Sequence, residues 1–187
     1  MEQGKKGQIV KDILLTLVVL GILTAVAVVA PNAILALGLL VRKKKYTKRQ
    51  ITRALSHLKD KKILGIGNDG RGNTVIKLTD QGKAKIIRYK LEDMVLNKPK
   101  RWDQKWRIVI FDIPEKFRVN RNTLSQKLKA LGFYQMQKSA WLWPYPVEDE
   151  VTFLKEVYEI RPFVSLVTAD RIEGEWRYLK HFGLSKI

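Results

Sequence analysis

The side chains with the clearest chemical potential lie between Thr47 and Lys59, where cationic and short polar residues recur at helical spacing. Thr47 followed by Gln50 is a capping-box pattern, which predicts that a helix begins here. Ammonium, guanidinium and hydroxyl groups on one helix face are what a recognition helix presents to the major groove of DNA and to its phosphates. An ordinary solvated helix face is the alternative. The residues predicted to contact DNA from this helix are Lys48, Arg49, Thr52, Arg53 and Ser56.

A hairpin pattern follows the basic helix and supplies two more cations. Ile63–Ile66 is predicted to be a strand, Gly67–Asn73 a tight turn and Thr74–Leu78 a returning strand. This hairpin is a candidate wing. We predict that Arg71, at its tip, reaches the minor groove or the DNA backbone, and that Lys77 lies behind it.

The elements around this hairpin complete a recognisable pattern. A closing helix is predicted after the returning strand, with Thr79 or Asp80 as its cap. Helix, helix, capped basic helix, glycine-rich hairpin and helix together resemble the winged helix-turn-helix family. The pattern of Leu78, Thr79 and Gly82 is common in bacterial members. The basic helix must bury its apolar stripe against the rest of this module: Ile51, Ala54, Leu55 and Leu58.

The distribution of charge agrees with a polyanion-binding first half. The chain has 187 residues with 36 Lys+Arg and 18 Asp+Glu, a formal net charge of +18. Residues 1–100 hold 21 basic and 7 acidic residues, and residues 101–187 hold 15 and 11. An excess of this kind attracts nucleic acid or an anionic membrane surface. A basic surface kept only for solubility would spread its charge evenly.

Several kinds of chemistry are excluded by composition. The chain has no cysteine, so disulfides, thiolate catalysis and cysteine zinc sites are ruled out. It has only two histidines, His57 and His181, which are too few for a histidine-rich metal centre.

An uncharged apolar run, Ile13–Ala30, precedes the basic module. One interpretation is a buried first helix that Pro31 ends, followed by a short second helix over Ala33–Val41. The alternative is a membrane span, since about 17–25 apolar residues cross a bilayer. The cations Arg42–Lys45 follow the run, so the rest of the chain is expected to face the cytoplasm in either case.

The second half predicts a different fold. Trp106–Ile113 and Phe163–Ala169 are predicted strands, and Phe133–Trp143 alternates like a single strand between them. Val119–Leu131 and Val147–Ile160 are the intervening predicted helices. This order accounts for most of a split βαβ, ferredoxin-like fold. Trp141 and Trp143 share one strand face, where we expect core or interface positions.

The motifs of the second half resemble a known family. KWRIVIFDIPE, KLKALGFYQMQKSAWLWPYP and the closing KHFGL look like the PaaX-like repressors over roughly Trp102–Leu184. Their central domain is similar to the small ferredoxin-like endonuclease of CRISPR adaptation. The resemblance implies a homodimer, sequence-specific operator binding and small-ligand control. Because the large C-terminal domain of full repressors has no counterpart here, we do not expect ligand control.

The same resemblance raises an enzymatic alternative. In the CRISPR-adaptation family the acidic residue that ends the first strand is proposed to hold a divalent metal near the dimer axis. Asp112 occupies the matching position, with Glu115 nearby, and Mg²⁺ prefers such oxygen ligands. A structural role is the other interpretation, in which Asp112 caps or hydrogen-bonds the start of the following helix and the Phe111–Pro114 turn.

The sequence therefore predicts an α+β chain with a winged helix-turn-helix in residues 1–96, a linker in 97–104 and a ferredoxin-like βαββαβ-type dimerisation domain in 105–187. The expected function is a dimeric regulator that binds double-stranded DNA, located in the cytoplasm and without a cofactor. The alternatives are a Mg²⁺-dependent nuclease that uses Asp112, and an adaptor anchored in the inner membrane by Ile13–Ala30 that binds DNA or lipid.

Overall fold

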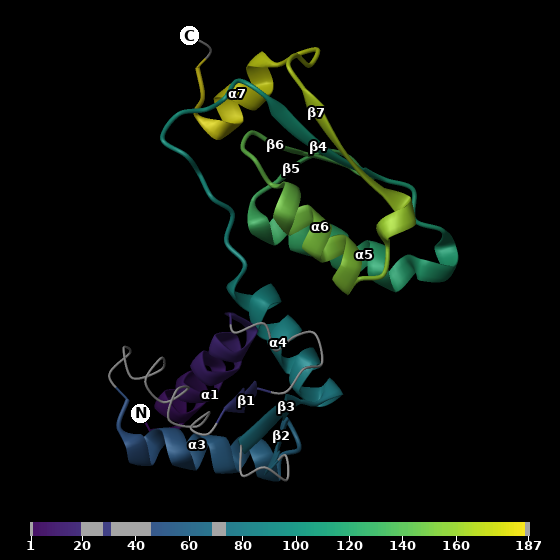
Figure 1. Cartoon of the computed structure of the whole chain (residues 1–187). Helices are drawn as coiled ribbons and strands as arrows, with labels where there is room; N and C mark the ends of the chain where they lie inside the picture. The colour runs from purple at the N-terminus through teal and green to yellow at the C-terminus, as the bar shows by residue number, and fades with distance from the viewer. Residues whose placement is uncertain (1, 20–27, 31–45, 69–73, 186–187) are drawn as a thin grey trace. The chain divides into compact units, whose positions relative to one another are not determined.

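The computed structural model describes residues 2–19, 28–30, 46–68 and 74–185 of the chain (Figure 1). The chain divides into two compact units, Met1–Asp93 and Met94–Ile187, and each unit mixes helices with an antiparallel sheet. The α+β class expected from the sequence is therefore confirmed.

The first unit packs helices against a small sheet. Its three strands are antiparallel in the order β1-β3-β2, with Val28 opposite Ile76 and Ile66 opposite Ile76 on the other side. The order of α1, α3, the β2–β3 hairpin and α4 agrees with the winged-helix prediction. The helix predicted for residues 33–41 lies outside the described residues. The elements are α1 (Glu2–Val19), β1 (Val28–Ala30), α3 (Lys48–Asp60), β2 (Leu64–Asn68), β3 (Thr74–Leu78) and α4 (Asp80–Asp93).

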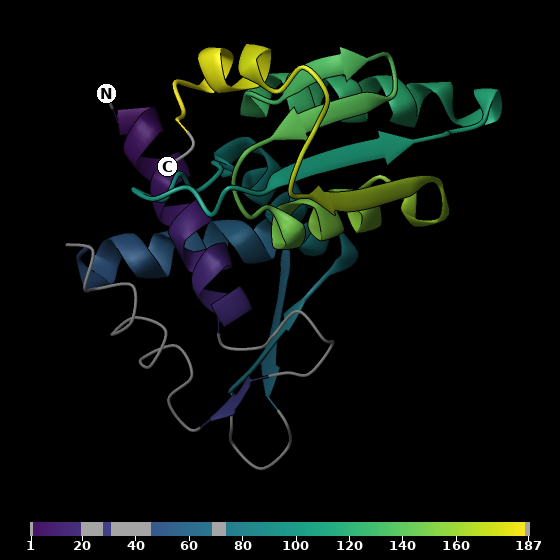
Figure 2. The ribbon, with the colours of Figure 1, turned by 90° about the horizontal axis from the view of Figure 1, so that it is seen from above.

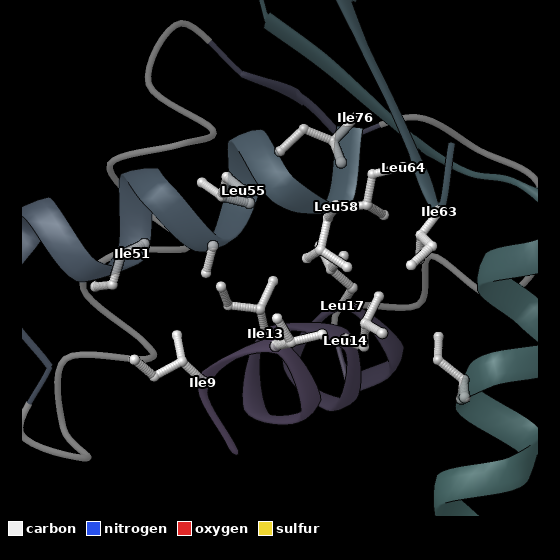
Figure 3. Close-up of a cluster of buried hydrophobic side chains, with 13 residues drawn as sticks. Ile9, Ile13, Leu14, Leu17, Ile51, Leu55, Leu58, Ile63, Leu64 and Ile76 are labelled. Carbon is white, nitrogen blue, oxygen red and sulfur yellow. The ribbon is translucent and has the colours of Figure 1, made fainter. Parts of the chain in front are cut away.

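The core of the first unit lies where α1 crosses α3 (Figures 2 and 3). Ile13 and Leu14 of α1 and Leu58 of α3 are fully buried there. Apolar burial at roughly 25 cal/mol per Å² is the main force that holds such elements together. The sheet side of the unit contributes three residues to the same cluster: Ile63, Leu64 and Ile76.

The prediction of one helix over Ile13–Ala30 is wrong. The helix α1 begins at Glu2 and ends at Val19, and Val28–Ala30 is strand β1. The valines there are β-branched and favour an extended backbone, and β3 supplies the hydrogen-bonding partners. The burial of Ile13 and Leu14 agrees with the buried-helix interpretation. Within the described residues, no helix is long and apolar enough to cross a membrane.

The second unit is ferredoxin-like. Its four strands are antiparallel in the order β5-β6-β4-β7, which is the strand order of a βαββαβ fold. Helices α5 and α6 lie on one side of this sheet (Figure 1). The elements are β4 (Trp106–Phe111), η2 (Glu115–Phe117), α5 (Arg118–Leu131), β5 (Tyr134–Gln137), β6 (Ala140–Trp143), α6 (Glu148–Val157), η3 (Arg161–Phe163), β7 (Val164–Ala169) and α7 (Trp176–Phe182).

The single strand predicted for Phe133–Trp143 is a hairpin. Lys138 and Ser139 form its turn, and a register shift between Gln135 and Gln137 interrupts the pairing of β5 with β6. The residues alternate on both sides of the turn, so the periodicity alone does not reveal the reversal. The hairpin provides the fourth strand that the ferredoxin-like fold requires.

Helix α7 was not anticipated, and it covers one end of the sheet face opposite α5 and α6. Its Tyr178 is buried with Trp106 and Leu142, with ring centroids of Tyr178 and Trp106 6.0 Å apart. On the same face Ile110 and Val167 remain 43% and 41% exposed. Helix α7 thus covers part of the apolar surface of this face within one chain and leaves Ile110 and Val167 exposed.

Part of the segment predicted as a linker packs on the second unit. The Trp102 and Trp106 rings lie 4.8 Å apart, and Arg107, itself buried, pairs with Asp103 at 2.6 Å between Nη2 and Oδ2. The hydrogen bond from Arg107 holds the pKa of the Asp103 carboxyl below its usual range. Residues 102–103 therefore form part of the second unit.

Candidate nucleic-acid interface

The start of helix α3 is fixed by the capping box that the sequence predicts. The Gln50 backbone N–H donates to Thr47 Oγ1 at 3.3 Å, and the Thr47 N–H donates to Gln50 Oε1 at 2.9 Å. These two bonds satisfy backbone donors that a helix start otherwise leaves open. The cationic residues that follow are therefore held on a defined first turn.

The helix α3 separates its buried and exposed residues as expected. Ile51, Ala54, Leu55 and Leu58 face the core, and every predicted DNA-contacting residue of the helix is exposed. The Thr52 hydroxyl donates to the Lys48 carbonyl at 3.0 Å, so its oxygen can still accept a hydrogen bond. The structure thus brings the following residues together on one exposed face, here called the α3 face: Lys48, Arg49, Thr52, Arg53 and Ser56.

The cations on the α3 face have no acidic partner among the residues that the structure describes. In the part of the chain that the structure describes, Lys48, Arg49 and Arg53 form no ion pair, and the first turn holds no acidic residue. Cations at a helix N-terminus oppose its partial positive charge, at a cost of about 0.3–1 kcal/mol. Two cations in this position are therefore unfavourable for the isolated fold, and an external anion would stabilise them.

A buried carboxylate of α1, which was not predicted from the sequence, joins α1 to the segment just before α3. The Tyr46 hydroxyl donates to Asp12 Oδ2 at 2.8 Å, and Gln8 Nε2 donates to Asp12 Oδ1 at 3.0 Å. Burial, helped by the bond to Asp12, raises the pKa of Tyr46 to about 12. Asp12 is only 4% exposed. An acidic residue beside an apolar run was the one sequence signal that pointed to this contact.

The structure describes one of the two cations predicted on the hairpin. Lys77 is exposed on β3 and lies opposite Gly65 of β2, while its neighbour Ile76 faces the core. Arg71 lies outside the described residues. Lys77 therefore belongs to the outer face of the hairpin, and the place of Arg71 stays a prediction.

The residue before α4, Thr79, is hydrogen-bonded to the turn between α3 and β2. The cap is Thr79, whose Oγ1 accepts from the Gly82 N–H at 3.1 Å and donates to the Lys62 carbonyl at 2.6 Å. Gly82 fits closely, since a Cβ there would lie 2.3 Å from the Ile63 carbonyl oxygen. The Thr and Gly of the winged-helix pattern thus serve to join α4 to the end of α3.

Asp112 lies in the other unit, at the end of β4, with an exposed side chain. Its backbone N–H donates to the Phe163 carbonyl at 3.0 Å, and the η2 helix that follows has no side-chain cap. Helix α5, which follows η2, has no side-chain cap either, so the expectation that Asp112 caps the following helix is wrong. Glu115 instead pairs with Arg121 at 2.9 Å. Among the described residues no cluster of three or more His, Cys, Asp or Glu could hold a metal.

A comparison with protein-family models gives a match in the second unit. The family model described as the PaaX protein central Cas2-like domain matches residues 99–178. No curated protein matches the chain. The matched residues cover strands β4 to β7 and helices α5 and α6, so the ferredoxin-like unit is similar to this domain in sequence.

Proposed function

We propose that this PaaX-like protein is a transcriptional regulator that binds double-stranded DNA as a dimer, since residues 99–178 match the family model of the PaaX central Cas2-like domain. The α3 face is the observation that carries the proposal. It presents cations and hydroxyl groups from a capped, well-packed helix, and no acidic residue lies in its first turn. The wing residues Lys77 and Arg71 would contact the adjacent backbone or minor groove.

Charge supports binding to a duplex rather than to a small anion. Residues 42–100 contain 18 Lys/Arg and 5 Asp/Glu. When such a surface neutralises phosphates it releases counterions, so affinity falls with a log–log salt slope near −0.9 for each contact. We expect a slope steeper than about −2 on a random duplex.

The substitution Arg53→Ala tests whether the α3 face recognises the base sequence of the DNA. If Arg53 makes a bidentate contact to guanine, the substitution weakens binding to a selected operator by about 1–3 kcal/mol and relaxes the preference at one base pair. The assay is fluorescence anisotropy on the operator obtained by selection from random duplexes. Lys129→Ala on α5 is the matched control, because Lys129 is also an exposed helix cation but belongs to the other unit.

Three outcomes separate the interpretations of this helix. Equal loss on operator and random DNA would place Arg53 on a phosphate. No loss would remove α3 from the interface. A wild-type protein that binds no duplex at all would overturn the proposed function.

A further inference from the structure

Four helix ends within the described residues share one hydrogen-bonding pattern. After α3, the Lys62 N–H donates to the Lys59 carbonyl at 2.9 Å, and the Ile63 N–H donates to the Leu58 carbonyl at 2.9 Å. This pair of bonds is the Schellman motif, whose turn residue adopts a left-handed backbone. Lys62 is that residue, with φ 53°.

The other three ends show which residue this turn favours. The turn residues after α5, α6 and α7 are Gly132 (φ 92°), Glu159 (φ 54°) and Gly183 (φ 64°). A left-handed backbone brings the Cβ of any other residue close to the following carbonyl oxygen, whereas glycine has no Cβ. Lys62 therefore occupies a position where glycine would be more stable.

The surroundings of Lys62 prevent the strain from relaxing. Its carbonyl accepts the Thr79 hydroxyl at 2.6 Å, and the next carbonyl, of Ile63, accepts the Thr79 backbone N–H at 3.2 Å. Ile63 is itself buried in the core beside Leu58. The backbone of this turn is thus held from both sides, while the Lys62 side chain is exposed.

Two more exposed lysines, Lys59 and Lys61, lie beside it at the end of α3. Lys59 follows Thr52 and Ser56 at helical spacing, so it continues the α3 face. In the described part of the chain none of these three lysines forms an ion pair. Attraction to the negative end of the helix accounts for cations here in general. It does not account for a lysine at the strained turn, because Lys59 and Lys61 already supply that charge.

We propose that Lys62, exposed on a turn whose backbone is held from both sides, binds a backbone phosphate of the duplex that the α3 face contacts. The inference rests on the proposed function. It adds a contact that is independent of base sequence and comes from a rigid turn rather than from the helix face.

The test is Lys62→Gly, for which the expected changes in stability and in binding have opposite signs. Removal of the strained Cβ should raise the melting temperature of the first unit by a few degrees. Loss of one phosphate contact should weaken binding to a random duplex about eight-fold near 0.1 M salt and make the salt slope shallower by about 0.9. Lys62→Arg keeps the charge and should bind like the wild type.

Glu159→Gly is the matched control. Glu159 has the same motif and nearly the same φ in the other unit, so its replacement should raise stability and leave DNA binding unchanged. If Lys62→Gly binds with the wild-type affinity and salt slope, the inference is overturned while the proposed function stands. If Lys62→Arg binds as weakly as Lys62→Gly, shape rather than charge is responsible and the inference also fails. If the wild type binds no duplex, both fail together.

Discussion

Replacing Gly82 by alanine tests the contact that joins α4 to the end of α3. In most helices this change stabilises by roughly 0.5–1 kcal/mol, because alanine is the better helix former. Here the added Cβ would lie 2.3 Å from the Ile63 carbonyl oxygen and 2.6 Å from Leu78 Cδ1. The oxygen belongs to the backbone, so the turn itself would have to move.

The cost follows from the bonds that such a shift would disturb. Thr79 joins the two segments through its hydroxyl to the Lys62 carbonyl (2.6 Å), its N–H to the Ile63 carbonyl (3.2 Å) and its oxygen to the Gly82 N–H (3.1 Å). Each bond contributes about 1 kcal/mol net. After the intrinsic gain from alanine is subtracted, we expect Gly82→Ala to lower the free energy of unfolding by about 2 kcal/mol.

Urea denaturation followed by far-UV circular dichroism measures this change, with an expected drop in midpoint of about 1 M. Gly7→Ala is the control, since nothing lies within 4 Å of a Cβ at that position of α1 and the variant should be slightly more stable. All five tryptophans lie in residues 102–176, so their fluorescence reports on the second unit during the same titration. A Gly82→Ala protein as stable as the wild type would refute the argument.

Three further predictions concern other contacts. Tyr46→Phe should lower the free energy of unfolding by about 1–3 kcal/mol, because the buried Asp12 loses a donor. The pKa of Tyr46 is raised from 10.0 to about 12 in the folded protein, so the stability of the wild type should fall as pH rises from 10 to 12. The variant has no hydroxyl to ionise at this position and should lack this part of the fall. Asp112→Asn should leave DNA binding intact, with no Mg²⁺-dependent cleavage of labelled DNA by either protein; cleavage by the wild type alone would establish the nuclease alternative. Val167→Glu should prevent the proposed dimer from forming through the ferredoxin-like unit, because Val167 and Ile110 are the apolar residues that stay exposed on one sheet face. Light scattering of the full chain should then give a lower mass than for the wild type; an unchanged mass would place the dimer contact elsewhere.

Local patterns in the sequence determined the elements whose ends and faces depend on near neighbours. Thr47 and Gln50 predicted the start of α3, and the spacing of Ile51 and Leu58 predicted which face is buried. Capping bonds and helical periodicity act over three or four residues, so they can be read from the sequence alone. The strand Thr74–Leu78 was predicted with its observed bounds because the glycine-rich turn before it marks where it begins.

Contacts between distant segments were decided by the tertiary structure. Strand β1 exists because β3 pairs with it, and the hydrogen bond between Asp12 and Tyr46 joins residues 34 positions apart. Helix α7, which was not predicted, covers part of one sheet face by burying Tyr178 against Trp106 and Leu142. The carbonyl of Lys62 is bound by Thr79, which lies 17 positions further along the chain. A one-dimensional pattern records which residues prefer burial or an extended backbone, but the partner that satisfies each preference is set by packing.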